Sequence, residues 1–119
     1  MERPFFEFSH VGINTDSREE AVKQVELIAS LFGTEARTNR KGSPFAGQYI
    51  EVMAGNPVGT HGHIAFYTDD IPGACAYFKE RGIAINEASA KRREDGSIYV
   101  IYLQEEIAGF AVQLIGKKD

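Results

Sequence analysis

The two halves of the chain repeat one short pattern, and this repeat constrains the fold more than any other feature of the sequence. Residues 10–16 read HVGINTD, and residues 63–69 read HIAFYTD. In each half a segment with helical periodicity follows, and later a short apolar segment carries one polar residue, Glu51 in the first half and Gln113 in the second. A repeat of this kind predicts two copies of one supersecondary unit.

Each copy is expected to contain a strand, a helix and three further strands. Capping residues and apolar spacing predict one helix from Asp16 or Ser17 to Gly33 and another from Asp69 or Asp70 to Gly82. The residues expected on the apolar face of the first helix are Ala21, Val25, Ile28 and Phe32. The segments predicted as strands are 6–14, 35–38, 43–46, 48–53, 62–68, 83–88, 98–103 and 109–115. The expected fold class is therefore α+β, with two tandem βαβββ units whose curved sheet forms a cup flanked by helices.

Length and composition are typical of one globular domain. The chain has 119 residues, 43% hydrophobic and 25% charged, so we expect a single domain over 1–119 with units at about 5–55 and 61–116. A net charge of −4 argues against nucleic-acid binding. No apolar run approaches the roughly 18–20 residues that cross a bilayer, and the first residues show no signal-peptide pattern. The single cysteine, Cys75, is typical of a reducing compartment, so a cytoplasmic location is expected.

Strand alternation places four polar residues on one face of the predicted sheet. The opposite, apolar face is expected to pack against the helices through Val11, Ile13, Ile50, Val52, Ile64, Phe66, Val112 and Leu114. The polar residues are His10, Glu51, His63 and Gln113, and the small residues Gly12 and Ala65 leave space beside the histidines. Two imidazoles, a carboxylate and an amide oxygen suit a divalent metal such as Ni, Co, Zn, Mn or Fe. The alternative is that each polar residue is hydrogen-bonded within the core.

The segments that carry these features resemble the vicinal-oxygen-chelate superfamily, which includes glyoxalase I, methylmalonyl-CoA epimerase, extradiol dioxygenases and bleomycin-resistance proteins. They are HVGI at 10–13, IEV at 50–52, GHIA at 62–65 and VQLI at 112–115. The resemblance spans essentially the whole chain. It implies a metal held by His10, Glu51, His63 and Gln113. Glyoxalase I usually has a glutamate at the position of Gln113, and because an amide accepts no proton at neutral pH, Glu51 is the expected catalytic base.

Segments 6–14, 45–47, 50–53 and 109–114 are similar to a small glyoxalase-like domain of Gram-positive bacteria. That domain is associated with the aldolase for 2-keto-3-deoxy-6-phosphogluconate and 4-hydroxy-2-oxoglutarate. The resemblance implies a metal-assisted lyase or isomerase acting on a small 2-oxo or 2-hydroxy acid, or on its thiol adduct. The alternatives are a non-catalytic accessory domain linked to that aldolase and a metal-free protein that sequesters a ligand, as bleomycin-resistance proteins do.

Aromatic and basic residues outside the four polar positions are weaker candidates for substrate contacts. Tyr49 and Tyr99 lie on predicted strands, and Arg92 lies near a predicted hairpin tip. Lys91 and Arg93 beside Arg92, and Arg37, Arg40 and Lys41 near the other tip, could likewise bind a carboxylate or phosphate. The alternative for each is packing or simple solvation. Exposed sheet edges invite pairing with a second subunit, so we expect a homodimer.

Overall fold

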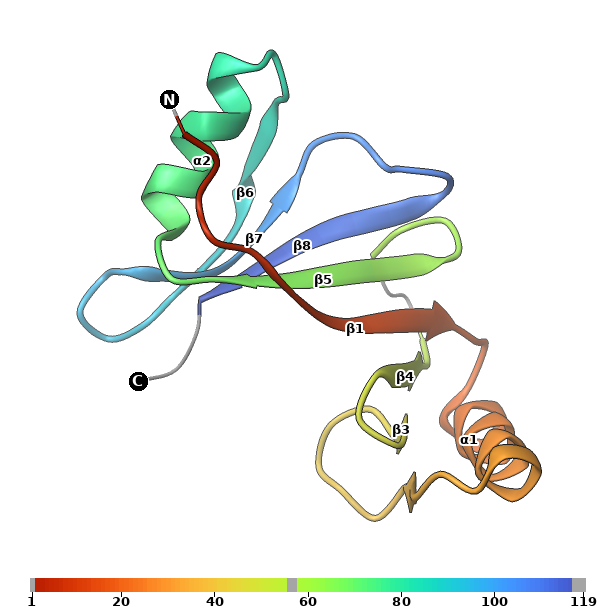
Figure 1. Cartoon of the computed structure of the whole chain (residues 1–119). Helices are drawn as coiled ribbons and strands as arrows, with labels where there is room; N and C mark the ends of the chain where they lie inside the picture. Colours follow the sequence, from red (N-terminus) through yellow and green to blue (C-terminus); the bar gives the residue numbers. More distant parts are fainter. Residues whose placement is uncertain (1, 56–57, 117–119) are drawn as a thin grey trace.

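In the computed structural model, which describes residues 2–55 and 58–116, both halves follow the order strand, helix and three strands. The first half contains β1 (Glu7–Asn14), α1 (Arg18–Phe32), β2 (Ala36–Arg37), β3 (Phe45–Ala46) and β4 (Ile50–Met53). The second half contains β5 (Gly62–Thr68), α2 (Ile71–Glu80), β6 (Ile85–Arg92), β7 (Ile98–Leu103) and β8 (Phe110–Gly116). The predicted α+β fold is confirmed (Figure 1).

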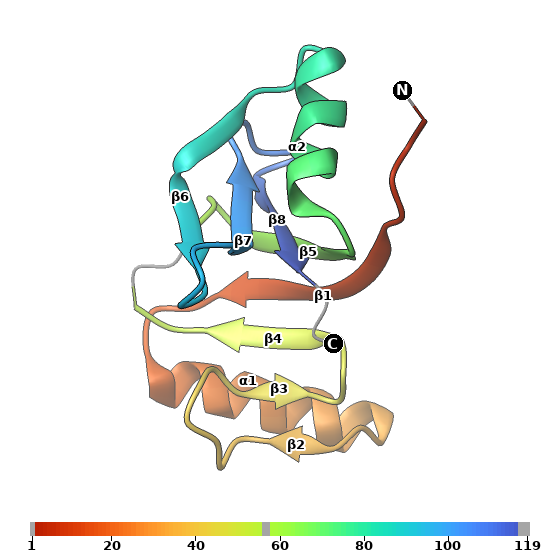
Figure 2. The ribbon, with the colours of Figure 1, turned by 90° about the vertical axis from the view of Figure 1, so that its left-hand side faces the viewer.

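The strands form one curved, mixed sheet in the order β2-β3-β4-β1-β5-β8-β7-β6. Within each half the first strand pairs in parallel with the last, β1 with β4 and β5 with β8. The halves join where β1 pairs antiparallel with β5, in the middle of the sheet (Figure 2). His10 lies opposite Ala65 there, and Gly12 lies opposite His63. An approximate twofold axis between β1 and β5 therefore relates the repeated residues of the two halves.

Each helix covers its own half of the sheet and forms a separate apolar core. Helix α1 contacts β2, β3 and β4, and α2 contacts β6 and β8. The buried residues under α1 are Ala21, Val25, Ala46 and Val52. Those under α2 are Ile71, Ala74, Ile85, Ile101 and Leu114. These clusters confirm that one face of the sheet packs against the helices.

Two residues predicted to face the core are exposed instead. Phe32 is 76% exposed, because it is the last residue of α1, next to the capping Gly33, and lies outside the cluster that packs under this helix. Ile13 is 39% exposed, since its partner on β5 is Gly62, which has no side chain to cover it.

Of the two starting residues that the sequence allows for each helix, the structure shows Ser17 and Asp70 as the capping residues. The Ser17 hydroxyl accepts a hydrogen bond from the Glu20 amide at the start of α1, and the Asp70 carboxylate accepts one from the Gly73 amide at the start of α2. Helix α1 ends at Gly33, which has a left-handed backbone. Neither helix in the described part of the chain is long and apolar enough to span a membrane.

Gly62 holds β5 against β1 directly beside His63, and we predict that it tolerates no side chain. Its φ is 146°, and a Cβ there would overlap the carbonyl oxygen of Gly12. Gly82 also has positive φ, but a Cβ at Gly82 would meet nothing within 4 Å. Chemical denaturation should therefore show a loss of about 3 kcal/mol or more in unfolding free energy for Gly62→Ala and about 1 kcal/mol for Gly82→Ala. Equal losses in the two variants would contradict this account of the β1–β5 contact.

Candidate metal centre

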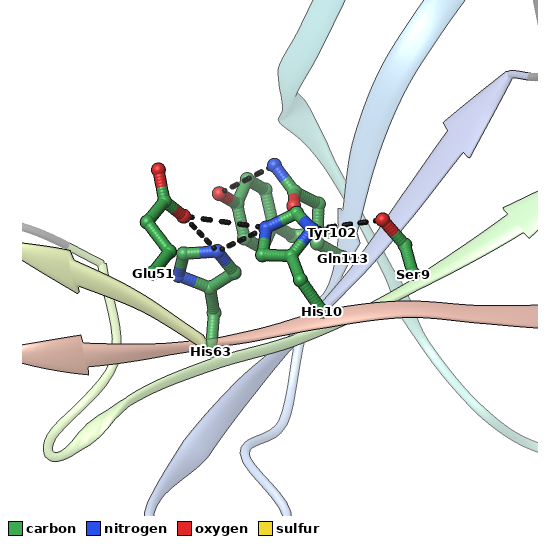
Figure 3. A network of polar contacts seen from close by, with 6 residues as sticks. All are labelled: Ser9, His10, Glu51, His63, Tyr102 and Gln113. Carbon is green, nitrogen blue, oxygen red and sulfur yellow. Dashed lines mark hydrogen bonds and ion pairs between the residues drawn. The ribbon is translucent and has the colours of Figure 1, made fainter. Parts of the chain in front are cut away.

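The register of the central strands brings three of the predicted ligands together. Gly12 on β1 pairs with Glu51 on β4 and with His63 on β5, so these residues form one row on one face of the sheet. His10 comes from the next row on the same face. The two imidazole Nε2 atoms are 3.1 Å apart, and Glu51 Oε1 lies 3.3 Å from His10 Nε2 and 3.2 Å from His63 Nε2 (Figure 3).

These separations fit one metal ion bound to all three atoms. Neighbouring ligands about 2.1 Å from an ion and roughly 90–100° apart are themselves separated by about 3.0–3.2 Å. The ligand atoms of His10, Glu51 and His63 lie within 4.8 Å of one another. Two imidazoles and a carboxylate suit Zn, Ni, Co, Mn or Fe. The cluster could therefore hold a divalent metal.

Gly12 provides the space that the His63 ring occupies. A Cβ at Gly12 would overlap the His63 imidazole, which shows that this ring lies directly over the β1 backbone. His63 is only 3% exposed. The sequence prediction that a small residue leaves space beside the histidines is confirmed at Gly12.

A β-bulge at Ser9 sets the direction of the His10 ring. The pairing of β1 with β5 shifts between Phe8 and His10, which leaves Ser9 as an extra residue in β1. The Ser9 hydroxyl oxygen lies 2.8 Å from His10 Nδ1. A tautomer in which Nδ1–H donates to Ser9 leaves a lone pair on Nε2, as metal binding through that atom would require. In the metal-free chain the hydrogen bond to Glu51 requires a proton on Nε2, which a bound metal would displace. Sequence analysis did not identify Ser9, because strand alternation gives no sign of a bulge.

The two histidines keep the Glu51 carboxylate ionised. Burial alone would raise the pKa of Glu51, but hydrogen bonds with His10 and His63 and their coulombic effect on the carboxylate outweigh it and lower the pKa to about 2. Glu51 Oε1 faces both imidazoles, whereas Oε2 points away from them (Figure 3). Within residues 2–55 and 58–116 nothing bonds to Oε2. One carboxylate oxygen is therefore placed as a ligand, and the other is open.

Gln113 lies on the same face of the sheet and has an unused buried oxygen. Its Nε2 donates to the Tyr102 phenolic oxygen at 3.1 Å, and its Oε1 is buried with no partner in the described part of the chain. An unpaired buried acceptor costs about 1–3 kcal/mol, a cost that a cation would remove. Burial and the negative charge of Glu51 raise the pKa of Tyr102, so its phenol stays protonated at neutral pH. Tyr102 is not among the tyrosines that the sequence indicates as substrate contacts, which are Tyr49 and Tyr99.

A cavity of about 630 Å³ opens beside His10, lined in part by Tyr49 and Phe45. Tyr49, a predicted substrate contact, therefore lies at the cavity. Tyr99 does not line this cavity. Its ring instead lies 5.7 Å from the Arg93 guanidinium carbon. Arg92 is also elsewhere, donating to the Gly96 carbonyl in the β6–β7 hairpin at 2.7 Å.

The fold is similar to that of methylmalonyl-CoA epimerases. One crystal structure of such an epimerase has a TM-score of 0.66 at 19% identity, with 100% of both chains covered. The Streptomyces coelicolor enzyme with 2-nitronate-propionyl-CoA has a TM-score of 0.63 at 19% identity, covering 93% of this chain and 94% of the other. The Mycobacterium tuberculosis epimerase has a TM-score of 0.62 at 16% identity, covering 94% and 88%. No protein-family profile and no curated protein sequence matches the chain.

These epimerases belong to the vicinal-oxygen-chelate superfamily, so the fold expected from the sequence resemblance is confirmed. At identities below 20% the likeness concerns the fold alone. The expected chemistry of this chain therefore rests on its own residues.

We predict that Ser9 strengthens metal binding by orienting the His10 ring. Ser9→Ala removes the hydrogen bond to His10 Nδ1 and should weaken Co²⁺ binding about 10–100-fold, as loss of an outer partner of a ligand usually does. Ser30→Ala is the matched control, because the Ser30 hydroxyl donates to the Leu27 carbonyl within α1, away from the cluster. Calorimetric titration of Co²⁺ into both variants measures the difference. Unchanged affinity in Ser9→Ala would show that Ser9 does not orient His10.

Proposed function

We propose that this chain is a metal-dependent isomerase or lyase that acts on a small 2-oxo or 2-hydroxy acid, or on its thiol adduct. The observation that carries the proposal is the placement of His10 Nε2, His63 Nε2 and Glu51 Oε1 within 3.1–3.3 Å of one another beside a cavity. Histidine and carboxylate clusters of this geometry, open on one side, suit Lewis-acid catalysis.

The proposed ligands are the two histidines through Nε2 and Glu51 through Oε1, with the unpaired Oε1 of Gln113 as the fourth. A bound divalent metal supplies stabilisation of negative charge on neighbouring substrate oxygens, worth several kcal/mol. The substrate would approach from the side of the cavity, past His10 and Phe45. The aromatic rings of Phe45 and Tyr49, which line the cavity, would exclude water from one side of the bound substrate.

Glu51 is also the proposed proton acceptor, through Oε2. This oxygen points away from the imidazoles, and the carboxylate is ionised at neutral pH. A carboxylate with a pKa of about 2 is a weak base, and a base works best when its pKa is near the working pH. The proposal therefore requires Glu51 to loosen its contacts with His10 and His63 when substrate binds. The protonated carboxyl would then return the proton to the product.

The solved epimerase structures suggest which compounds to test. One of them is described in complex with methylmalonyl-CoA, so acyl-CoA thioesters belong beside 2-oxo acids and hemithioacetals as candidate substrates. The association with a sugar-acid aldolase, the homodimer and the cytoplasmic location stay predictions.

Metal binding should stabilise the chain through the two histidines. Co²⁺, Ni²⁺, Mn²⁺ or Zn²⁺ at about 100 times its dissociation constant should raise the melting temperature of the metal-free chain by roughly 10 °C. His10→Ala and His63→Ala should abolish the rise, because each removes one of the three converging ligands. His61→Ala is the matched control, since His61 lies against the Phe110 ring outside the cluster. No rise in the unaltered chain, or an equal loss in His61→Ala, would contradict the proposed ligand set.

Glu51→Gln keeps an amide oxygen that can act as a ligand but removes the base, so calorimetric titration should still show Co²⁺ binding in this variant. In Glu51→Gln, turnover of the active substrate should fall about 10²–10⁴-fold, as expected for a lost general base. Glu87→Gln is the control, because Glu87 pairs with Lys79 on an exposed surface. Turnover is measured with metal-loaded protein on 2-oxo acids, hemithioacetals and acyl-CoA thioesters. Binding without turnover of any of these compounds would replace the enzyme proposal with the accessory or sequestering role.

A further inference from the structure

Two arginines line the cavity that opens beside the metal cluster. The Arg37 and Arg40 guanidinium carbons lie 5.2 and 4.8 Å from the centre of the Phe45 ring. The Phe45 ring in turn meets the His10 ring at 5.7 Å, edge to face. These contacts keep the Arg40 guanidinium within about 10.5 Å of the His10 ring. One small molecule could therefore contact both the arginines and the metal cluster.

The charges of this arginine pair are largely uncompensated. Arg40 has no carboxylate partner in the described part of the chain. Arg37 Nε approaches Glu35 Oε1 only at 3.8 Å, and both side chains are well exposed, so this pair contributes little. Glu7 is the other charged residue on the cavity wall. Because the two guanidinium carbons lie 5.2 and 4.8 Å from one ring centre, they are no more than about 10 Å apart, and an anion in the cavity that contacts both groups would compensate their charge.

The loop that carries Arg40 is fixed to α1 by a third arginine. Arg18 Nη1 donates to the Gly42 carbonyl at 2.8 Å, and its Nη2 donates to the Thr38 and Arg40 carbonyls at 2.9 and 3.3 Å. Arg18 therefore acts as a positioning residue that holds the Arg40 backbone beside the cavity.

We propose that Arg37 and Arg40 form an anion-binding subsite that receives a carboxylate or phosphate at the end of the substrate remote from the metal cluster. Guanidinium groups bind both anions through paired, charge-assisted hydrogen bonds. This inference rests on the proposed function and narrows it: the substrate has neighbouring oxygens at one end and an anionic group at the other.

Calorimetric titration of the metal-free chain tests the subsite without relying on the metal. Inorganic phosphate and succinate are the two probes, and tighter binding of one identifies the subsite as a phosphate or a carboxylate site. Each of Arg37→Gln and Arg40→Gln should weaken the preferred probe roughly tenfold or more. Arg18→Gln should weaken it less, because the arginine pair remains but its loop is loosened.

The matched control is Arg81→Gln, since the Arg81 guanidinium also stacks on an aromatic ring, Tyr77, at 4.3 Å but lies at the end of α2. It should bind the probe like the unaltered chain. The two proposals can fail separately. If the unaltered chain binds the probe but metal does not raise its melting temperature, the subsite is upheld and the metal proposal is removed. Binding of neither probe, or equal binding in the Arg37→Gln/Arg40→Gln double variant, would overturn the subsite.

Discussion

The pairing of β1 with β5 is the contact on which the candidate site depends. It places Gly12 opposite His63 and His10 opposite Ala65, so a small residue faces each histidine across the junction of the two halves. At Gly12 the missing side chain lets the His63 imidazole lie over β1 and reach Glu51 on β4. A shift of this pairing by one residue would turn these side chains to the opposite face of the sheet. The cluster of His10, Glu51 and His63 therefore forms only because the two repeated units pair in this register.

The approximate twofold symmetry of the fold is broken in the chemistry of the two halves. Glu51 on β4 and Gln113 on β8 occupy equivalent places, since they pair across the sheet with Gly12 and Ala65. Glu51 contacts both imidazoles, whereas the Gln113 amide donates to Tyr102. The carboxylate of the cluster thus comes from the same half of the chain as the two arginines that line the cavity.

Much of this arrangement could be predicted from the sequence because it follows from periodicity. The repeated histidine motif identified the two units, and strand alternation placed His10, Glu51 and His63 on one face. Strands β5 and β7 match their predicted ranges residue for residue. Other features depend on local irregularity or on contacts between distant residues, which a period-two pattern does not encode. The bulge at Ser9 and the hydrogen bonds from Arg18 to its loop are of this kind. Tyr99 was predicted to contact substrate because alternation alone does not indicate which strand face borders the cavity.

The central claim is that His10, Glu51 and His63 bind one metal ion together. Crystals of the full chain grown with Co²⁺, with diffraction data collected at the cobalt absorption edge, test this directly. The account predicts one anomalous peak about 2.1 Å from His10 Nε2, His63 Nε2 and Glu51 Oε1. A structure in which cobalt binds elsewhere on the chain, with the His10 and His63 rings still in contact as they are without metal, would contradict it.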